Sequence, residues 1–257
     1  MSNYLMHMMA RVGMSEPLSR SMLQHAKLVS YEPEQLIWKK GDTLDYWQLV
    51  IEGLVVASAP KGDGERMPMF IYGNHTWFGE QSILNRRPTA LDYHAASDVQ
   101  AMRLPAALMV QALDREPMFL KRVASMVSWR AEMSADTLAL MKFGSPAMRV
   151  VMGLGLFTEA LASHSERPPT IGFDGGLEIP VTQAVLARLC GVSRTLFSEY
   201  LQQLAANSWV RIGYGKLEVQ SIGTWQRFLR CLRRDSVSLG TATIEDLLTQ
   251  LDVHAVV

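Results

Sequence analysis

The sequence contains little cysteine and no long apolar run. Its 257 residues include two cysteines, Cys190 and Cys231, too few for a disulfide framework, a paired-cysteine redox motif or an iron–sulfur cluster. No stretch is apolar over the length needed to cross a bilayer, and the Met-rich residues 1–10 lack a secretory cleavage pattern. We therefore expect a cytoplasmic protein without a membrane partner.

An overall excess of charge is also absent, because 25 Lys and Arg residues balance 25 Asp and Glu residues. This balance excludes a protein that is positively charged over its whole surface, but the charge is unevenly distributed along the chain. Residues 180–234 hold eight Lys or Arg and two acidic residues, an excess of six. Such asymmetry is typical of a surface that binds duplex nucleic acid, although a solvated charged surface has the same count. A 48% hydrophobic composition is sufficient for two domains with cores.

Residues 183–202 have the pattern of a helix-turn-helix. Gly191 lies where the turn needs a left-handed backbone, and Ser193 follows as the N-cap of a second helix. Apolar or semi-apolar residues occupy the packing positions, namely Leu186, Cys190, Val192, Phe197 and Tyr200. An ordinary helical hairpin with a glycine turn would share this pattern, so the flanking sequence decides between the two.

Residues 209–219 read as two short strands around a glycine-containing turn, directly behind the helix pair. This position is typical of a winged helix-turn-helix, in which Arg211 and Lys216 of the wing would contact phosphates while Arg194 reads a base. The predicted DNA-binding residues are Thr182, Gln183, Ser193, Arg194, Thr195, Ser198, Glu199, Arg211 and Lys216.

The first hundred residues have a different pattern. After a helix predicted at 17–26, short strand-like runs alternate with turn residues, at 35–39, 46–51, 54–58, 67–72, 90–95 and 99–104. Several short strands at this spacing predict an antiparallel sandwich or jelly roll, whose interior is either packed or open to a small ligand.

A long helix is predicted at 119–141, with Pro117 near its start. A heptad stripe runs along it through Phe119, Val123, Met126, Arg130, Met133, Thr137 and Leu140. The stripe favours a parallel dimer seam, although a helix that covers one face of a barrel has the same spacing. Arg130 either extends outward or meets an acid or a ligand. Gly144, Ser145 and Pro146 then end this helix and start the next.

This order of elements resembles the Crp/Fnr family of bacterial transcription regulators over residues 28–219. Further similarities are Lys40-Gly41-Asp42, residues 50–55 and Phe78-Gly79-Glu80. The resemblance implies an α+β protein with an N-terminal antiparallel β jelly-roll barrel, a long dimerisation helix and a C-terminal winged helix-turn-helix. The implied domains are a sensory cyclic-nucleotide-binding-like barrel (1–114), the dimerisation helix (115–143), the DNA-binding domain (144–222) and a helical extension (223–257).

The effector site departs from that of family members that bind cyclic AMP. These members follow a Gly-Glu pair with Arg-Ser-Ala, whereas Pro88 here stands in place of the arginine that holds the cyclic phosphate. We do not expect tight binding of cyclic AMP, an iron–sulfur cluster or another cofactor, so the effector is unidentified or absent. The candidate effector-binding residues are Gly79, Glu80, Arg87, Thr89 and Arg130.

The recognition helix also departs from the family pattern. Arg194 fits an arginine that bonds guanine, but Thr195 replaces the usual glutamate and Glu199 the usual second arginine. The operator should therefore differ from the family's common half-sites. The extension beyond the wing either packs against the DNA-binding domain or adds phosphate contacts through its arginines, which are Arg227, Arg230, Arg233 and Arg234.

The predicted function is that of a homodimeric, sequence-specific transcription regulator without catalytic activity. Its expected partners are a palindromic DNA operator, a second copy of the chain, RNA polymerase and an unidentified small molecule. The alternative is a cupin-like metalloenzyme with His75, Glu80 and His94 in its barrel. Such sites generally need a His-x-His pair, which the sequence lacks, and this interpretation leaves the wing unexplained.

Overall fold

The computed structural model describes residues 2–62, 65–162, 175–234 and 240–255, which divide into two compact units. The first comprises Met1–Glu65 and Tyr72–Met133, and the second comprises Arg66–Ile71 and Ser134–Val257. The division falls between Met133 and Ser134, within the long helix α5 (Pro117–Phe143). The domain boundaries predicted after residues 114, 143 and 222 are not tested by this division and stay predictions. No helix among the described residues is long and apolar enough to cross a membrane.

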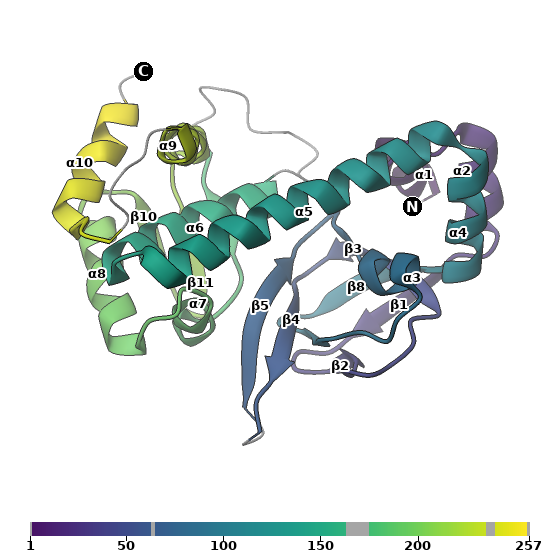
Figure 1. The fold of residues 1–257 in the computed structure, drawn as a ribbon, viewed down its shortest axis with the longest axis horizontal. Coiled ribbons are helices and arrows are strands. Elements are labelled where there is room, and N and C mark those ends of the chain that lie inside the picture. The colour runs from purple at the N-terminus through teal and green to yellow at the C-terminus, as the bar shows by residue number, and fades with distance from the viewer. Residues whose placement is uncertain (1, 63–64, 163–174, 235–239, 256–257) are drawn as a thin grey trace. The chain divides into compact units, whose positions relative to one another are not determined.

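The N-terminal strands form two four-stranded sheets, as the sequence predicts for a sandwich (Figure 1). The strand orders are β1-β8-β3-β6 and β2-β7-β4-β5. The strands are β1 (Lys27–Tyr31), β2 (Leu36–Trp38), β3 (Tyr46–Glu52), β4 (Val55–Pro60), β5 (Arg66–Tyr72), β6 (Trp77–Phe78), β7 (Asp92–Ala95) and β8 (Val99–Pro105). All six predicted strands occur. Two further strands were not predicted: β1 is mostly exposed and lacks alternation, and β6 has only two residues.

Four short helices accompany these sheets: α1 (Ser2–Arg11), α2 (Glu16–Leu23), α3 (Glu80–Asn85) and α4 (Ala106–Arg115). The helix predicted at 17–26 is α2, which starts one residue earlier because the Ser15 hydroxyl accepts a hydrogen bond from the Leu18 amide. Trp47 of β3 and Trp77 of β6 lie on neighbouring strands of one sheet and stack with their ring centroids 3.9 Å apart. This aromatic pair is fully buried, and Trp47 also contacts Phe119 of the helix that follows α4.

Helix α5 starts at Pro117 as predicted, but part of its heptad stripe is covered within the single chain, while Met126, Met133 and Thr137 are half-buried. Phe119, Val123 and Leu140 are at most 1% exposed within the single chain, and the Phe119 ring contacts Trp47. The assignment of these residues to a dimer seam is therefore wrong, and the alternative of a helix that covers its own chain's core applies to them. Helical spacing alone does not distinguish the two, because an apolar stripe has the same period whichever surface covers it.

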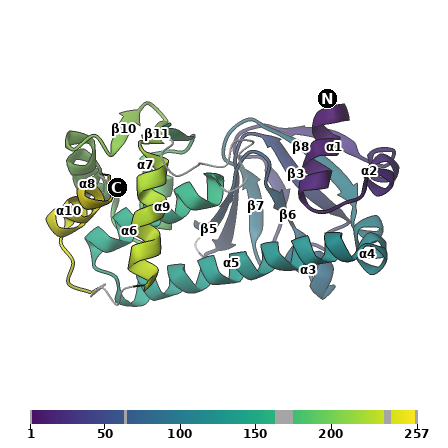
Figure 2. The same ribbon diagram turned by 90° about the horizontal axis from the view of Figure 1, so that it is seen from above.

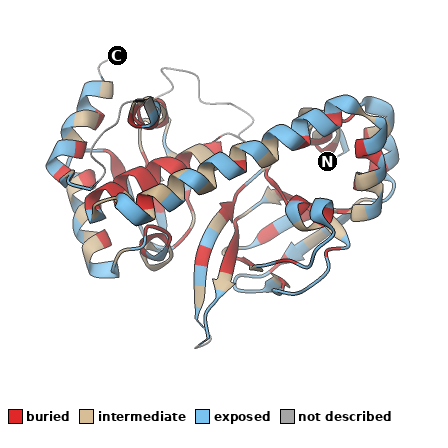
Figure 3. Ribbon diagram, in the orientation of Figure 1, coloured by how far each residue is buried: buried red, intermediate tan, exposed pale blue. Residues whose placement is uncertain are grey.

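The second unit contains α6 (Pro146–Ala162), the helix pair α7 (Gln183–Leu189) and α8 (Arg194–Ala206), and a sheet in the order β10-β11-β9 (Figure 2). Its strands are β9 (Leu177–Ile179), β10 (Val210–Gly213) and β11 (Lys216–Val219). The predicted helix-turn-helix and wing hairpin are both present. The third strand, β9, was not predicted. Figure 3 shows that α6 is buried along most of its length, as the central helix of this unit.

The extension beyond the wing forms α9 (Ile222–Arg234) and α10 (Ile244–Ala255), which pack on each other and on α6. Trp225 and Phe228 of α9 are fully buried. The Arg227 guanidinium donates two hydrogen bonds to the His254 carbonyl near the end of α10. Arg233 pairs with Asp136 of α5 and Glu159 of α6, each at 2.8 Å. The extension therefore packs against the rest of its unit, and Arg227 and Arg233 contribute to that packing.

The predicted break between α5 and α6 is confirmed at Gly144-Ser145-Pro146. The Ser145 hydroxyl accepts a hydrogen bond from the Met148 amide and so caps α6. The same hydroxyl donates to the Ala242 carbonyl at 2.7 Å. The segment that leads into α10 is thus hydrogen-bonded to the connection between α5 and α6.

Candidate nucleic-acid interface and barrel interior

The turn between α7 and α8 has the geometry that its sequence predicts. Gly191 has a φ of +63°, and a Cβ atom there would lie 2.7 Å from the Met141 sulfur. The Ser193 hydroxyl accepts a hydrogen bond from the Leu196 amide at 3.2 Å and caps α8. These local contacts fix where α8 begins, and they place Arg194 on its first turn.

Cys190, just before this turn, is a packing residue. Its side chain is fully buried, and a Cβ atom on Gly153 of α6 would lie 2.8 Å from its sulfur. Burial raises the pKa of the Cys190 thiol well above its ordinary value. The thiol is therefore protonated at neutral pH, as expected for a small buried hydrophobic residue.

Helix α8 separates its packing face from its solvent face. Phe197, Leu201 and Leu204 are fully buried and hold the helix on the unit's core. Arg194, Thr195 and Glu199 are exposed and Ser198 is half-buried, so the predicted base-reading residues share the solvent side. Among the described residues, none forms an ion pair or side-chain hydrogen bond with Arg194.

The predicted phosphate-contacting residues before α7 have a second, structural role. The Thr182 hydroxyl accepts a hydrogen bond from the Val185 amide at 3.4 Å and caps α7. Thr182 is exposed, and the adjacent Gln183 is half-buried. The hydroxyls of Thr182 and Ser193 accept from helix amides, which leaves each hydroxyl proton able to bond an anion.

Both wing cations are paired with acids on neighbouring strands. The Arg211 guanidinium lies 2.9 Å from a Glu218 carboxylate oxygen, and the Lys216 ammonium lies 2.7 Å from a Glu178 carboxylate oxygen. Strand register places Arg211 opposite Glu218, and Glu218 opposite Glu178. The hydrogen bond and the charge of Glu178 raise the pKa of Lys216. Glu178 was not predicted as a partner, because it lies 38 residues before Lys216 in the sequence.

The barrel unit instead buries its main charge pair. Glu80, the first residue of α3, is 2% exposed and Arg130 of α5 is 9% exposed. Their side chains form an ion pair, and the guanidinium also donates to the Trp77 carbonyl. It lies over the Tyr72 ring, with its carbon 5.2 Å from the ring centroid. Of the alternatives predicted for Arg130, contact with an acid is the one observed.

Aromatic side chains surround this pair. Phe78 contacts Trp38, Tyr72 and Tyr93, with ring centroids 5.2 to 5.8 Å apart. Burial raises the pKa of both tyrosine hydroxyls, and the charge of Glu80 raises them further. Both phenols are therefore neutral near pH 7. These aromatics were not predicted as site residues, because they come from separate strands and have the pattern of ordinary core residues in the sequence.

The remaining candidate effector residues are placed differently. Gly79 has a φ of +97°, and a Cβ atom there would approach the Trp38 ring to 2.9 Å, so the backbone passes close to the aromatic cluster. Thr89 is 3% exposed, and its hydroxyl donates to the Leu91 carbonyl at 3.1 Å. Arg87 is exposed. The structure thus brings Gly79, Glu80 and Arg130 to the barrel interior, while Arg87 lies on its surface.

The histidines of the metalloenzyme alternative do not assemble a site. His75 contacts the Tyr4 ring at 5.5 Å, and His94 is 8% exposed on β7. Within the part of the chain that the structure describes, no three His, Cys, Asp or Glu side chains are grouped so that they could hold a metal ion.

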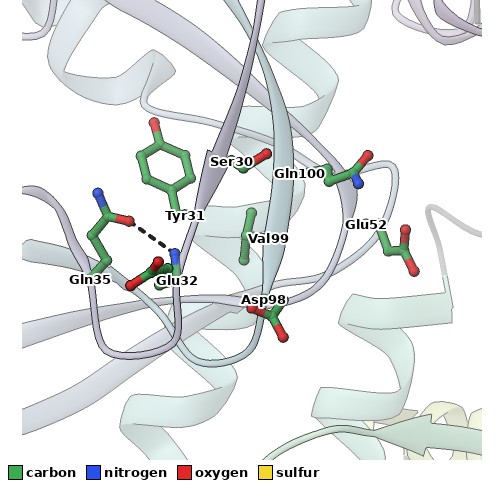
Figure 4. A pocket seen from close by; sticks show the side chains of 8 residues that line it. All are labelled: Ser30, Tyr31, Glu32, Gln35, Glu52, Asp98, Val99 and Gln100. Atoms are coloured by element: carbon green, nitrogen blue, oxygen red, sulfur yellow. Dashed lines mark hydrogen bonds between the residues drawn. The ribbon is translucent and has the colours of Figure 1, made fainter.

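The barrel also carries a surface pocket of about 730 Å³ between the ends of β1 and β8 (Figure 4). Three acids line it, Glu32, Glu52 and Asp98, together with neutral polar side chains. Like charges disfavour an anion there. A phosphate-bearing effector would therefore be repelled by this pocket.

Comparisons with known proteins agree with this arrangement. Residues 28–116 match the cyclic nucleotide-binding domain family. FixK2 from Bradyrhizobium japonicum has a similar structure, with a TM-score of 0.64, 16% identity and coverage of 85% of this chain and 98% of that one. The c-di-GMP-responsive global regulator CLP of Xanthomonas campestris gives a TM-score of 0.59 at 18% identity and covers 80% of this chain and 100% of its own.

A CRP/FNR-family transcriptional regulator from Thermus thermophilus gives a TM-score of 0.56 at 21% identity, with 79% of this chain and 98% of that chain covered. A search of curated proteins finds no match. By their names, CLP is a global regulator and the Thermus thermophilus protein is a transcriptional regulator. Residues 28–116 form a cyclic nucleotide-binding-type domain, and the chain has the fold of the CRP/FNR transcription regulators.

Proposed function

We propose that this protein is a homodimeric transcription regulator that binds a palindromic DNA operator and acts on RNA polymerase. The observation that carries the proposal is the exposed first turn of α8, where Arg194 has no partner among the described residues. A helix presented in this way enters the major groove, and an arginine at its start bonds guanine O6 and N7. Thr195, Ser198 and Glu199 complete the surface that contacts base edges. Thr182, Gln183 and Ser193 donate hydrogen bonds to the phosphate backbone of the DNA.

Selection of bound sequences from a random duplex library tests this function with the full chain. The expected result is a two-fold symmetric site with half-sites about 34 Å apart. Arg194→Ala should weaken operator binding by about 1–3 kcal/mol and relax preference at one base pair in each half-site. Arg230→Ala is the matched control, because Arg230 is exposed on α9 of the same unit. Failure to enrich any sequence would contradict the proposal.

The dimer is proposed to form through the solvent face of α5. Ala124, Ser128, Ala131, Ala135 and Leu138 are exposed and repeat every four and three residues. This face differs from the seam predicted from the sequence, four of whose seven residues are buried within the chain. Ala131→Glu should place like charges across a two-fold seam and yield monomers in sedimentation, whereas Ala131→Ser should remain dimeric. A dimeric Ala131→Glu protein would place the interface elsewhere.

The barrel is proposed to respond to an effector other than cyclic AMP, or to have lost that role. Arg130 and Glu80 bind each other, and the Thr89 hydroxyl bonds a backbone carbonyl. Pro88 provides no charge for a phosphate. Calorimetry with cyclic AMP should show no binding in the micromolar range, and a micromolar or tighter complex would overturn this part of the proposal.

A further inference from the structure

The wing presents almost no net charge to its surroundings. Its cations, Arg211 and Lys216, each bond an acid across a strand boundary, so the four side chains together are neutral. All four lie on one face of the sheet β10-β11-β9, because strand register aligns Arg211, Glu218 and Glu178, and Lys216 is two residues from Glu218. A phosphate contact through either cation would have to displace its carboxylate.

The tip of the same hairpin presents an aromatic ring instead. Tyr214 is the most exposed of the large hydrophobic side chains among the described residues, at 105% of the reference area. It occupies a two-residue turn with Gly215, whose φ is +68°, and Gly213 precedes it. Neither glycine has a side chain that could cover the ring. The Lys216 stem lies against Gly213, directed toward Glu178, so it leaves the ring uncovered as well.

From these two observations we propose that the wing meets DNA through Tyr214, while Glu178 and Glu218 hold its cations away from the phosphates. The inference rests on the proposed DNA-binding function, and it departs from the expectation that Arg211 and Lys216 are phosphate contacts. The Tyr214 ring packs on sugars and base edges of the minor groove beside the half-site, where aromatic and apolar side chains of other proteins insert. The neutral wing thereby adds affinity without adding salt-dependent, sequence-independent binding.

Salt dependence distinguishes this contact from a phosphate contact. Neutralising phosphates releases counterions and gives the affinity a slope against salt concentration, whereas ring packing releases none. Tyr214→Ser should therefore lower operator affinity at least about fivefold and leave the salt slope unchanged, and Tyr214→Phe should bind like the wild type. Lys216→Gln should leave the slope within about 0.3 of the wild type, instead of reducing it by about one per subunit.

The acids provide an independent arm of the same experiment. The double variant Glu178→Gln, Glu218→Gln frees both cations, so its affinity for random duplex DNA should rise and its salt slope should steepen. Arg230→Gln serves as the control for charge removed outside the wing. These measurements use the full-length protein, an operator selected from a random library and a scrambled duplex, at several salt concentrations.

Two results would overturn the inference: normal operator affinity in Tyr214→Ser, or a loss of about one unit of salt slope per subunit in Lys216→Gln. Normal operator binding by Tyr214→Ser combined with impaired transcription would assign the ring to a protein partner. Wild-type protein that selects no operator would instead defeat the proposed function itself. The two failures are therefore distinguishable.

Discussion

The barrel and the wing both pair cations with carboxylates, but at opposite levels of solvent exposure. In the barrel, the Arg130 and Glu80 side chains are 11% and 2% exposed, whereas Lys216 and Glu178 of the wing are 52% and 53% exposed. Buried charges must keep a partner because they have lost water, while the loss of a partner costs an exposed, hydrated charge little stability. The same pairing thus maintains structure in one region and sets the local net charge in the other.

Removing one member of the buried pair is the strongest test of this comparison. Arg130→Met leaves the Glu80 carboxylate buried without its cation, and it also removes the hydrogen bond to the Trp77 carbonyl. We expect a loss of about 3–5 kcal/mol in the free energy of unfolding, measured by urea denaturation.

The double variant Glu80→Met, Arg130→Met provides the control, because it removes both charges and leaves neither uncompensated. It should recover most of the lost stability. A single variant as stable as the wild type would show that the barrel tolerates an unpaired charge, and the distinction between the two regions would fail.

Arg233 is an intermediate case, since its side chain is 31% exposed and those of Asp136 and Glu159 are 26% and 22% exposed. It joins α9 to both α5 and α6 through charged hydrogen bonds. Arg233→Met should lower the free energy of unfolding by about 1–2 kcal/mol, less than Arg130→Met, because partial hydration weakens each bond.

Arg230→Met is the matched control for that measurement and should change stability little, since Arg230 is exposed on the same helix. Equal effects of Arg233→Met and Arg230→Met would show that the contacts with α5 and α6 do not stabilise the extension. If Arg233→Met lowered the free energy of unfolding as much as Arg130→Met, the contribution of an ion pair to stability would not follow its burial.

Local features were predictable from sequence, and pairings between distant segments were not. The turn at Gly191 and the cap at Ser193 were found because a left-handed turn and an N-cap each depend on neighbouring residues. Glu178 was missed because its link to Lys216 requires β9 to join the wing. No periodicity within either segment reports that pairing.

The stripe on α5 shows a second limit of sequence reasoning. Its spacing correctly predicted a long helix with one covered face, and it singled out Arg130 as an exception within that face. Whether Phe119 and Val123 face a partner or their own barrel depends on what lies nearby in space, which a heptad period does not encode. The barrel aromatics Tyr72 and Tyr93 were missed for the same reason, because they come together only in the folded sandwich.

The smallest effect on stability is expected at the wing. Lys216→Gln and Glu178→Gln should each leave the thermal unfolding midpoint of the full chain unchanged within measurement error. Both side chains are more than half exposed, so water replaces the lost partner and salt already screens the pair. The pKa of Lys216 is raised by Glu178, which leaves the ammonium fully charged near pH 7, and Glu178→Gln should not alter that charge. A drop in the midpoint comparable to that of Arg130→Met would mean that the exposed pair holds the wing sheet together. In that case any change in DNA binding by these variants would reflect a damaged wing rather than redistributed charge.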